Sequence, residues 1–125
     1  MATCPCGSGD GFAACCRPYL RGDAEAPTAE SLMRSRYTAY VRGDEDYLSR
    51  TWHPSTRPAT LDLAQTPWRG LDVLATEAGG PDDDEGTVTF VAHYATGAIS
   101  MGSMREVSAF TRVNGHWLYV GGEVS

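Results

Sequence analysis

The sequence predicts an α+β fold in which N-terminal helices pack on one face of a curved antiparallel sheet of about four strands. Three observations support this prediction. All four cysteines fall within residues 4–16, apolar residues recur at helical spacing over residues 27–41, and from Trp68 onward apolar and polar residues alternate with period two. Because the helical patterns precede the strands instead of alternating with them, helices and sheet should form separate layers.

Two units are expected, at residues 1–22 and 23–125. The first is rich in glycine and proline and has too few apolar side chains for its own core, so a bound metal is expected to fold it. Its cysteines form two close pairs, Cys4 with Cys6 and Cys15 with Cys16. Four thiolates at this spacing suit a structural Zn²⁺ and leave no open position for catalysis. The alternatives are an iron–sulfur cluster, another metal ion, a redox switch or two disulfides, although a bridge between adjacent cysteines is strained. A guanidinium from Arg17 or Arg21 would offset the negative charge of the site.

The second unit begins with its principal helix, over residues 27–41, which Thr28 caps and Gly43 ends. One broad face carries the apolar side chains that we expect to be buried, Leu32, Met33, Tyr37, Tyr40 and Val41. Arg36 lies beside this face, so its head either extends to water, as is common, or enters a pocket. A second, shorter helix is expected over residues 44–52 because acidic residues fill its first turn.

The rest of the chain is expected to form strands. Four stretches show the alternation of half-buried strands, residues 68–77, 87–96, 103–113 and 116–120. An acidic loop at residues 79–86 joins the first two, and Asn114-Gly115 is a strong hairpin signal between the last two. Residues 61–66, before the first strand, fit either a short helix or an irregular crossing.

A cavity is expected between helices and sheet, and Glu106 is its main polar candidate because it shares a strand face with apolar residues. A carboxylate there should pair with a guanidinium, for which Arg36 is the natural partner, or serve as an acid or base. A buried ion pair without chemistry is the plainer alternative. His53 would either end the second helix or lie at the mouth of the cavity as a base. Aromatic residues could line the cavity or simply fill the core. The candidate pocket residues are Arg36, Tyr37, Tyr40, Trp52, His53, Glu106 and Trp117, with Tyr119 beside them.

The composition argues against several classes of partner. The net charge is −6 and the chain has no Lys, which disfavours non-specific binding to nucleic acid or anionic lipid. No apolar run reaches the roughly 18 residues of a membrane span, and the first residues do not resemble a secretory signal. We therefore expect no membrane association and a cytoplasmic location.

Two groups of motifs resemble known families. Cys4-Pro5-Cys6-Gly7-Ser8-Gly9 followed by Cys15-Cys16 resembles the SEC-C motif, a short zinc-binding element also found at the C-terminus of the preprotein translocase ATPase. Further blocks are similar to the YchJ-like family of uncharacterised bacterial proteins, namely Leu32-Met33-Arg34-Ser35-Arg36-Tyr37, Thr51-Trp52-His53-Pro54 and Gly115-His116-Trp117. The resemblance implies a zinc motif followed by an NTF2-like domain, a cone of helices against a bent sheet, and implies no reaction. Residues 10–14 lack the lysines usual in SEC-C motifs.

Two functions are compatible with these features. The favoured one is a binding module that docks to a protein partner, such as the secretion or translation machinery, or holds a small-molecule ligand. The other is a small enzyme of hydrolase, isomerase or dehydratase type, with Glu106 or His53 as acid or base. Domains of the implied fold often dimerise through the outer face of the sheet, so we also expect that a homodimer can form.

Overall fold

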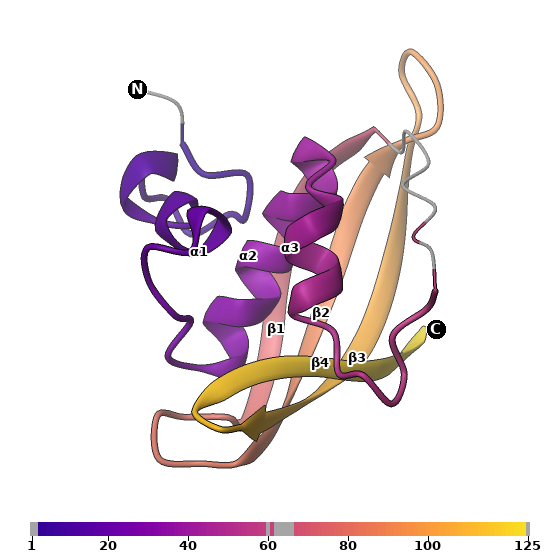
Figure 1. Ribbon diagram of the computed structural model, residues 1–125. Helices are drawn as coiled ribbons and strands as arrows, with labels where there is room; N and C mark the ends of the chain where they lie inside the picture. Colours follow the sequence, from indigo (N-terminus) through magenta and orange to yellow (C-terminus); the bar gives the residue numbers. More distant parts are fainter. Residues whose placement is uncertain (1–2, 60, 62–66, 125) are drawn as a thin grey trace.

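The computed structural model describes residues 3–59, 61 and 67–124 (Figure 1). Its elements follow the predicted order, with helices first and strands after. They are a short 3₁₀ helix η1 (Phe12–Ala14), helices α1 (Arg17–Arg21), α2 (Ala29–Arg42) and α3 (Glu45–Arg50), and strands β1 (Trp68–Ala78), β2 (Glu85–Ala95), β3 (Met101–Val113) and β4 (His116–Val124). The α+β class is therefore confirmed. Of residues 61–66, whose structure the sequence left open, only Leu61 lies within the described residues.

The four strands form one antiparallel meander in the order β1-β2-β3-β4. Register shifts interrupt the β1–β2 ladder and the β3–β4 ladder. Such bulges increase the local twist of a sheet, and here the sheet bends so that α2 and α3 lie on one face (Figure 1). The predicted Asn114-Gly115 turn is present, with φ angles of 52° and 83°. Strand β4 runs to Val124, beyond the predicted end at residue 120, because its last residues pair with β3.

Helices α2 and α3 begin where their capping residues predict, and α2 also ends as predicted, whereas α3 ends at Arg50, before the predicted end at residue 52. The Thr28 side chain accepts a hydrogen bond from the Ser31 backbone N–H at 3.0 Å, and Gly43 ends α2 in a left-handed conformation. The Asp44 side chain accepts a hydrogen bond from the Tyr47 backbone N–H and caps α3. These caps fix the two helices as a pair joined by a very short connection.

The buried surface of α2 is wider than the single apolar face that the sequence predicted. Tyr40 and Val41 were expected to be buried, but they are 38% and 40% exposed, whereas Ser35 and Thr38 are fully buried. The reason is that α2 contacts more than the sheet. Ser35 Oγ lies 2.7 Å from the hydroxyl of Tyr47 on α3, and Thr38 faces the cysteine cluster. Helix α2 therefore contacts other elements on several sides, and only near its C-terminal end are Tyr40 and Val41 exposed to solvent.

The N-terminal unit packs beside α2 and against β1 (Figure 1). Gly7 has a φ of 80°, and a Cβ placed on it would lie 2.7 Å from the carbonyl oxygen of Leu71 in β1. Only glycine permits this approach of two backbones. The short helix α1 follows Cys16 and ends at Gly22. None of the described helices is long and apolar enough to cross a membrane.

Candidate functional site

The four cysteines meet at one point. Their Sγ atoms all lie within 4.8 Å of one another. Cys4 and Cys6 come from a first short loop, and Cys15 and Cys16 come from a second one, between η1 and α1. The Cys6–Cys15 and Cys15–Cys16 sulfur distances are 3.6 and 3.9 Å. Tetrahedral coordination with metal–sulfur bonds of about 2.3 Å requires sulfur–sulfur distances of about 3.8 Å. The cluster therefore fits a tetrahedrally coordinated metal ion.

Backbone hydrogen bonds fold the two cysteine loops. The backbone N–H of Cys4 donates to the carbonyl of Asp10 at 2.8 Å, and that of Gly7 donates to the carbonyl of Cys4 at 3.3 Å. These bonds close the first loop on itself. Cys15 follows the 3₁₀ helix η1 and Cys16 precedes α1, so the second pair sits between two rigid turns.

The protonation of the cluster also favours a bound cation. A hydrogen bond from the Cys16 thiol lowers the pKa of Cys6 to about 4. Burial raises the pKa of Cys15 to about 11, and the hydrogen bond to Cys6, together with burial, raises the pKa of Cys16. One thiolate at Cys6 thus opposes the formation of others nearby because like charges repel. A divalent cation at the centre would remove this repulsion.

Side chains from α2 and the first loop surround the sulfurs. The Thr38 hydroxyl donates to Cys16 Sγ at 3.4 Å and lies 3.7 Å from Cys4 Sγ, while Ser8 Oγ lies 3.2 Å from Cys15 Sγ. Hydrogen bonds of this kind orient metal ligands. Sequence reasoning missed Thr38, because a threonine in the middle of a helix carries no local signal of a distant partner.

The cation beside the cysteines is a different arginine from those expected. Arg21 pairs instead with Asp23 at 3.7 Å, and Arg17 is exposed. Arg34, on α2, donates from Nη1 to the carbonyl of Cys6 at 2.7 Å and from Nε to Glu30 at 2.9 Å. Helix α2 places this guanidinium against the first loop. The sequence did not predict this contact, because Arg34 lies far from the cysteines along the chain.

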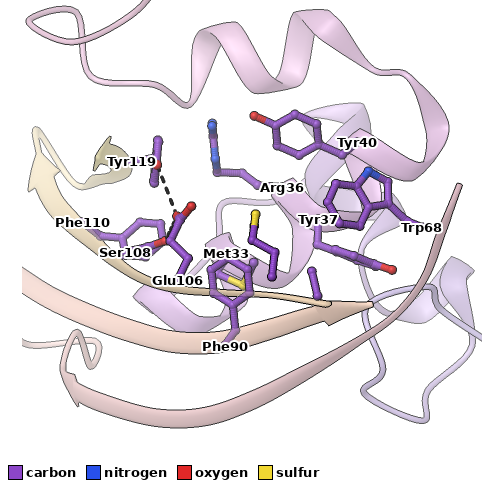
Figure 2. A pocket seen from close by; sticks show the side chains of 12 residues that line it. Met33, Arg36, Tyr37, Tyr40, Trp68, Phe90, Glu106, Ser108, Phe110 and Tyr119 are labelled. Atoms are coloured by element: carbon purple, nitrogen blue, oxygen red, sulfur yellow. Dashed lines mark hydrogen bonds between the residues drawn. The ribbon is translucent and has the colours of Figure 1, made fainter. Parts of the chain in front are cut away.

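The second feature is a cavity of about 280 Å³ between α2 and the sheet (Figure 2). Its walls are mostly aromatic or apolar. They come from α2 on one side and from all four strands on the other, and consist of Met33, Arg36, Tyr37, Tyr40, Trp68, Phe90, Ala92, Met104, Glu106, Ser108, Phe110 and Tyr119. The predicted residues Arg36, Tyr37, Tyr40 and Glu106 are brought together here.

The guanidinium of Arg36 does not extend to water, although this is the more common arrangement for such a residue. The other expected arrangement is observed, because Arg36 lines the cavity. The residue is 4% exposed. Its Nη1 donates to the carbonyl of Leu48 at 2.9 Å and to Thr51 Oγ1 at 2.7 Å. Its guanidinium carbon lies 5.0 Å from the ring centroid of Trp52 and 4.6 Å from that of Tyr119. Burial lowers the pKa of Arg36.

Glu106 faces the cavity from β3, as predicted, but the expected ion pair with Arg36 is absent from the described residues. Its Oε2 accepts hydrogen bonds from the hydroxyl groups of Ser108 and Tyr119, the latter at 3.3 Å (Figure 2). Gly122 on β4 leaves the space that this carboxylate fills, since a Cβ there would clash with it. The prediction failed because hydroxyl groups of β3 and β4, and not a guanidinium of α2, bind this carboxylate.

Three predicted pocket residues lie outside the cavity wall. Trp52 packs edge-on against Tyr119 with ring centroids 5.0 Å apart, and the indole N–H of Trp117 donates to the carbonyl of Pro27 at 3.2 Å. The ring of His53 turns to Ser55, whose backbone N–H donates to its Nδ1 at 3.0 Å. Trp52 and His53 lie outside the cavity because a backbone bridge joins the end of α3 to β4. In this bridge the backbone N–H of His53 donates to the carbonyl of Tyr119 at 2.8 Å. The bridge thereby fixes the backbone of Tyr119, whose side chain lines the cavity.

Trp68 lines the cavity although the sequence did not single it out. Its ring packs edge-on against Tyr37 and Tyr94, with centroids 6.1 and 5.9 Å apart. The pattern of alternation begins at Trp68, so its position as the first strand residue was the available signal. Which face it would take depended on the bulge that follows it in β1.

Comparison with known proteins covers both the cysteine motif and the domain that follows it. The family model for the YchJ middle NTF2-like domain matches residues 28–122, and that for the SEC-C motif matches residues 2–18. A UPF0225 protein of Streptomyces coelicolor is 51% identical over 121 residues, covering 96% of this chain and 94% of the relative. A UPF0225 protein of Chromobacterium violaceum is 52% identical over 129 residues, covering 99% and 94%.

Two solved structures share the fold. The solution structure of a SEC-C motif containing protein from Rhodopseudomonas palustris has a TM-score of 0.84 at 35% identity and covers 96% of both chains. The crystal structure of a SEC-C motif containing protein from Psychrobacter arcticus has a TM-score of 0.80 at 27% identity and covers 100% of this chain and 84% of that one. With a SEC-C motif, the matched middle domain and relatives at about half identity, the chain belongs to the UPF0225 family of proteins with a YchJ-type NTF2-like domain.

Proposed function

We propose that this protein binds a structural Zn²⁺ through its four cysteines and a small organic molecule in the cavity between α2 and the sheet. The observation that carries the second part is a cavity with apolar walls that holds two ionisable side chains, Arg36 and Glu106. Small-molecule sites combine these properties, and a volume of about 280 Å³ lies near the small end of their range.

The zinc would join the two units of the chain. The sulfur geometry suits four thiolate ligands, and a closed set of four leaves no position for a reacting water. Thr38 connects the cluster to α2, and Gly7 connects it to β1. Binding of a structural zinc stabilises small motifs by about 10–16 kcal/mol, which is enough to order a segment without its own core.

Elemental analysis of the purified full chain tests the metal. We expect one zinc per chain, and we expect Cys15→Ser to lose it because the set of ligands is then incomplete. Arg17→Gln is the control, since Arg17 is exposed next to Cys16 in the chain and the variant leaves all four ligands. Purified protein that contains iron, or no metal with an equally ordered N-terminal unit, would contradict the proposal.

Ligand binding is tested by amide NMR with a library of small organic molecules. Binders should shift amide signals of α2, β2 and β3 around the cavity. Ala92→Leu places a larger side chain on the cavity wall and should abolish these shifts. Ala109→Leu, on the opposite face of β3, is the control that should leave them unchanged. Shifts confined to the outer face of the sheet would argue against the cavity as the site.

A catalytic use of the same cavity is a second candidate. It is favoured by the hydrogen bond between the Tyr119 hydroxyl and Glu106, which would let a carboxylate and a phenol exchange a proton with a substrate. In that case a bound molecule would be recovered chemically changed, and Glu106→Gln would bind it without changing it. Docking of the zinc motif to a protein partner stays a prediction of the sequence.

A further inference from the structure

We propose, building on ligand binding in the cavity, that the bound molecule is a small monocarboxylate with an apolar body, which Arg36 recognises. Arg36 is 4% exposed. The ion pairs of the described part of the chain all involve other residues, so no carboxylate of that part lies within 4.0 Å of this guanidinium. A buried cation is strongly destabilising unless an anion compensates it.

The protein contacts of Arg36 are all uncharged. They are the carbonyl of Leu48, the hydroxyl of Thr51 and the rings of Trp52 and Tyr119. Dipoles and aromatic rings hold a guanidinium in place and partly replace its water. The negative charge of Glu106 also acts on Arg36, but from beyond ion-pair distance. The surroundings of Arg36 therefore fix its orientation and leave room for an anion.

The part of the guanidinium without a protein acceptor can serve a ligand. Both hydrogen bonds come from Nη1, and within the described residues Nε and Nη2 donate to no acceptor. Arg36 also lines the cavity, from the side of α2 (Figure 2). The planar edge formed by two guanidinium N–H groups matches the two oxygens of a carboxylate.

The remaining walls restrict what else the molecule can carry. Met33, Tyr37, Trp68 and Phe90 offer apolar surface to its body. Glu106 lies across the cavity and uses Oε2 to accept from Ser108 and Tyr119. Its negative charge disfavours a ligand with a second anionic group, such as a dicarboxylate or a phosphate dianion. An O–H or N–H of the ligand would instead find an acceptor in this carboxylate.

Matched acids and amides test this inference on the native protein. Three pairs of increasing size are titrated and followed by amide NMR: butanoate and butanamide, phenylacetate and phenylacetamide, indole-3-acetate and indole-3-acetamide. The acid of at least one pair should bind at least about tenfold more tightly than its amide and shift the amides of α2 and β3. Amides that bind as tightly as acids would overturn the carboxylate inference and leave ligand binding intact. If none of the six shifts amides around the cavity, both proposals fail.

Variants at the two ionisable residues of the cavity assign the preference. Arg36→Lys keeps the charge and removes the planar fork, so the acid-to-amide ratio should fall several-fold. Glu106→Gln removes negative charge from the opposite wall, and acid affinity should stay equal or rise. A ratio unchanged in Arg36→Lys and lost in Glu106→Gln would refute the assignment to Arg36. Should Arg36→Lys fail to fold, the comparison of acids and amides on the native chain still decides the question.

Discussion

Replacement of Thr38 by valine is the sharpest test of how the main helix supports the metal cluster. Thr38 is fully buried, and its hydroxyl lies 3.4 Å from Cys16 Sγ and 3.7 Å from Cys4 Sγ. Valine has nearly the same shape but no hydroxyl, so Thr38→Val removes a donor to the cysteine sulfurs and leaves the packing. Hydrogen bonds to charged groups contribute about 1.5–3 kcal/mol. We therefore expect zinc affinity to fall by about ten- to a hundredfold.

Thr38→Ser is the matched control because it keeps the hydroxyl and removes a buried methyl group. It should retain the zinc affinity of the native chain and lower the free energy of unfolding by about 1 kcal/mol. Zinc affinity is measured by competition with a chromophoric chelator, and the free energy of unfolding by urea denaturation with zinc in excess. Native zinc affinity in Thr38→Val would refute the hydrogen-bond account. Equal zinc loss in both variants would show that packing, and not the hydroxyl, supports the cluster.

Three further predictions follow from other contacts. Arg34→Gln removes the cation that contacts the carbonyl of Cys6, so zinc affinity should fall by about tenfold, whereas the exposed Arg17→Gln should leave it unchanged in the same chelator assay. Trp117→Phe loses the hydrogen bond to Pro27 and part of a buried side chain, so the free energy of unfolding in urea should fall by about 1–3 kcal/mol; an unchanged value would argue against this contact. Burial raises the pKa of Tyr47 to about 12. The folded state therefore holds this proton more tightly than the unfolded chain, and the free energy of unfolding should decline by about 2 kcal/mol as the pH rises from about 10 to about 12. Tyr47→Phe should abolish that part of the decline, and urea denaturation across this pH range measures it.

The fold was largely predictable because its signals are local. Helical spacing in α2, the caps at Thr28 and Asp44 and the Asn114-Gly115 turn each depend on a few neighbouring residues. Strand alternation also placed Glu106 on the inner face of the sheet, where the structure has it. The two cysteine pairs indicated a metal cluster in the same way, since their spacing fixes which sulfurs can meet.

The partners of these residues were not predictable by the same means. The sequence suggested Arg36 for Glu106, but Glu106 contacts Tyr119 while Arg36 packs between the rings of Trp52 and Tyr119. It suggested Arg17 or Arg21 near the cysteines, where α2 supplies Arg34. Arg34 lies on another element, far from the cysteines in the chain, whereas the partners of Glu106 are hydroxyl groups of its own strand and of the next one.

The sequence by itself therefore determined the order of elements, the gathering of the cysteines and the presence of a carboxylate in the interior. Tertiary structure alone decided that Thr38 faces the sulfurs and that Arg36 is buried without an ion pair to any described carboxylate. The physical reason is one of range. Backbone geometry repeats over a few residues and leaves a periodic signal, whereas the choice of contact across α2, α3 and β4 follows from how separate elements pack, for which adjacent residues carry no pattern.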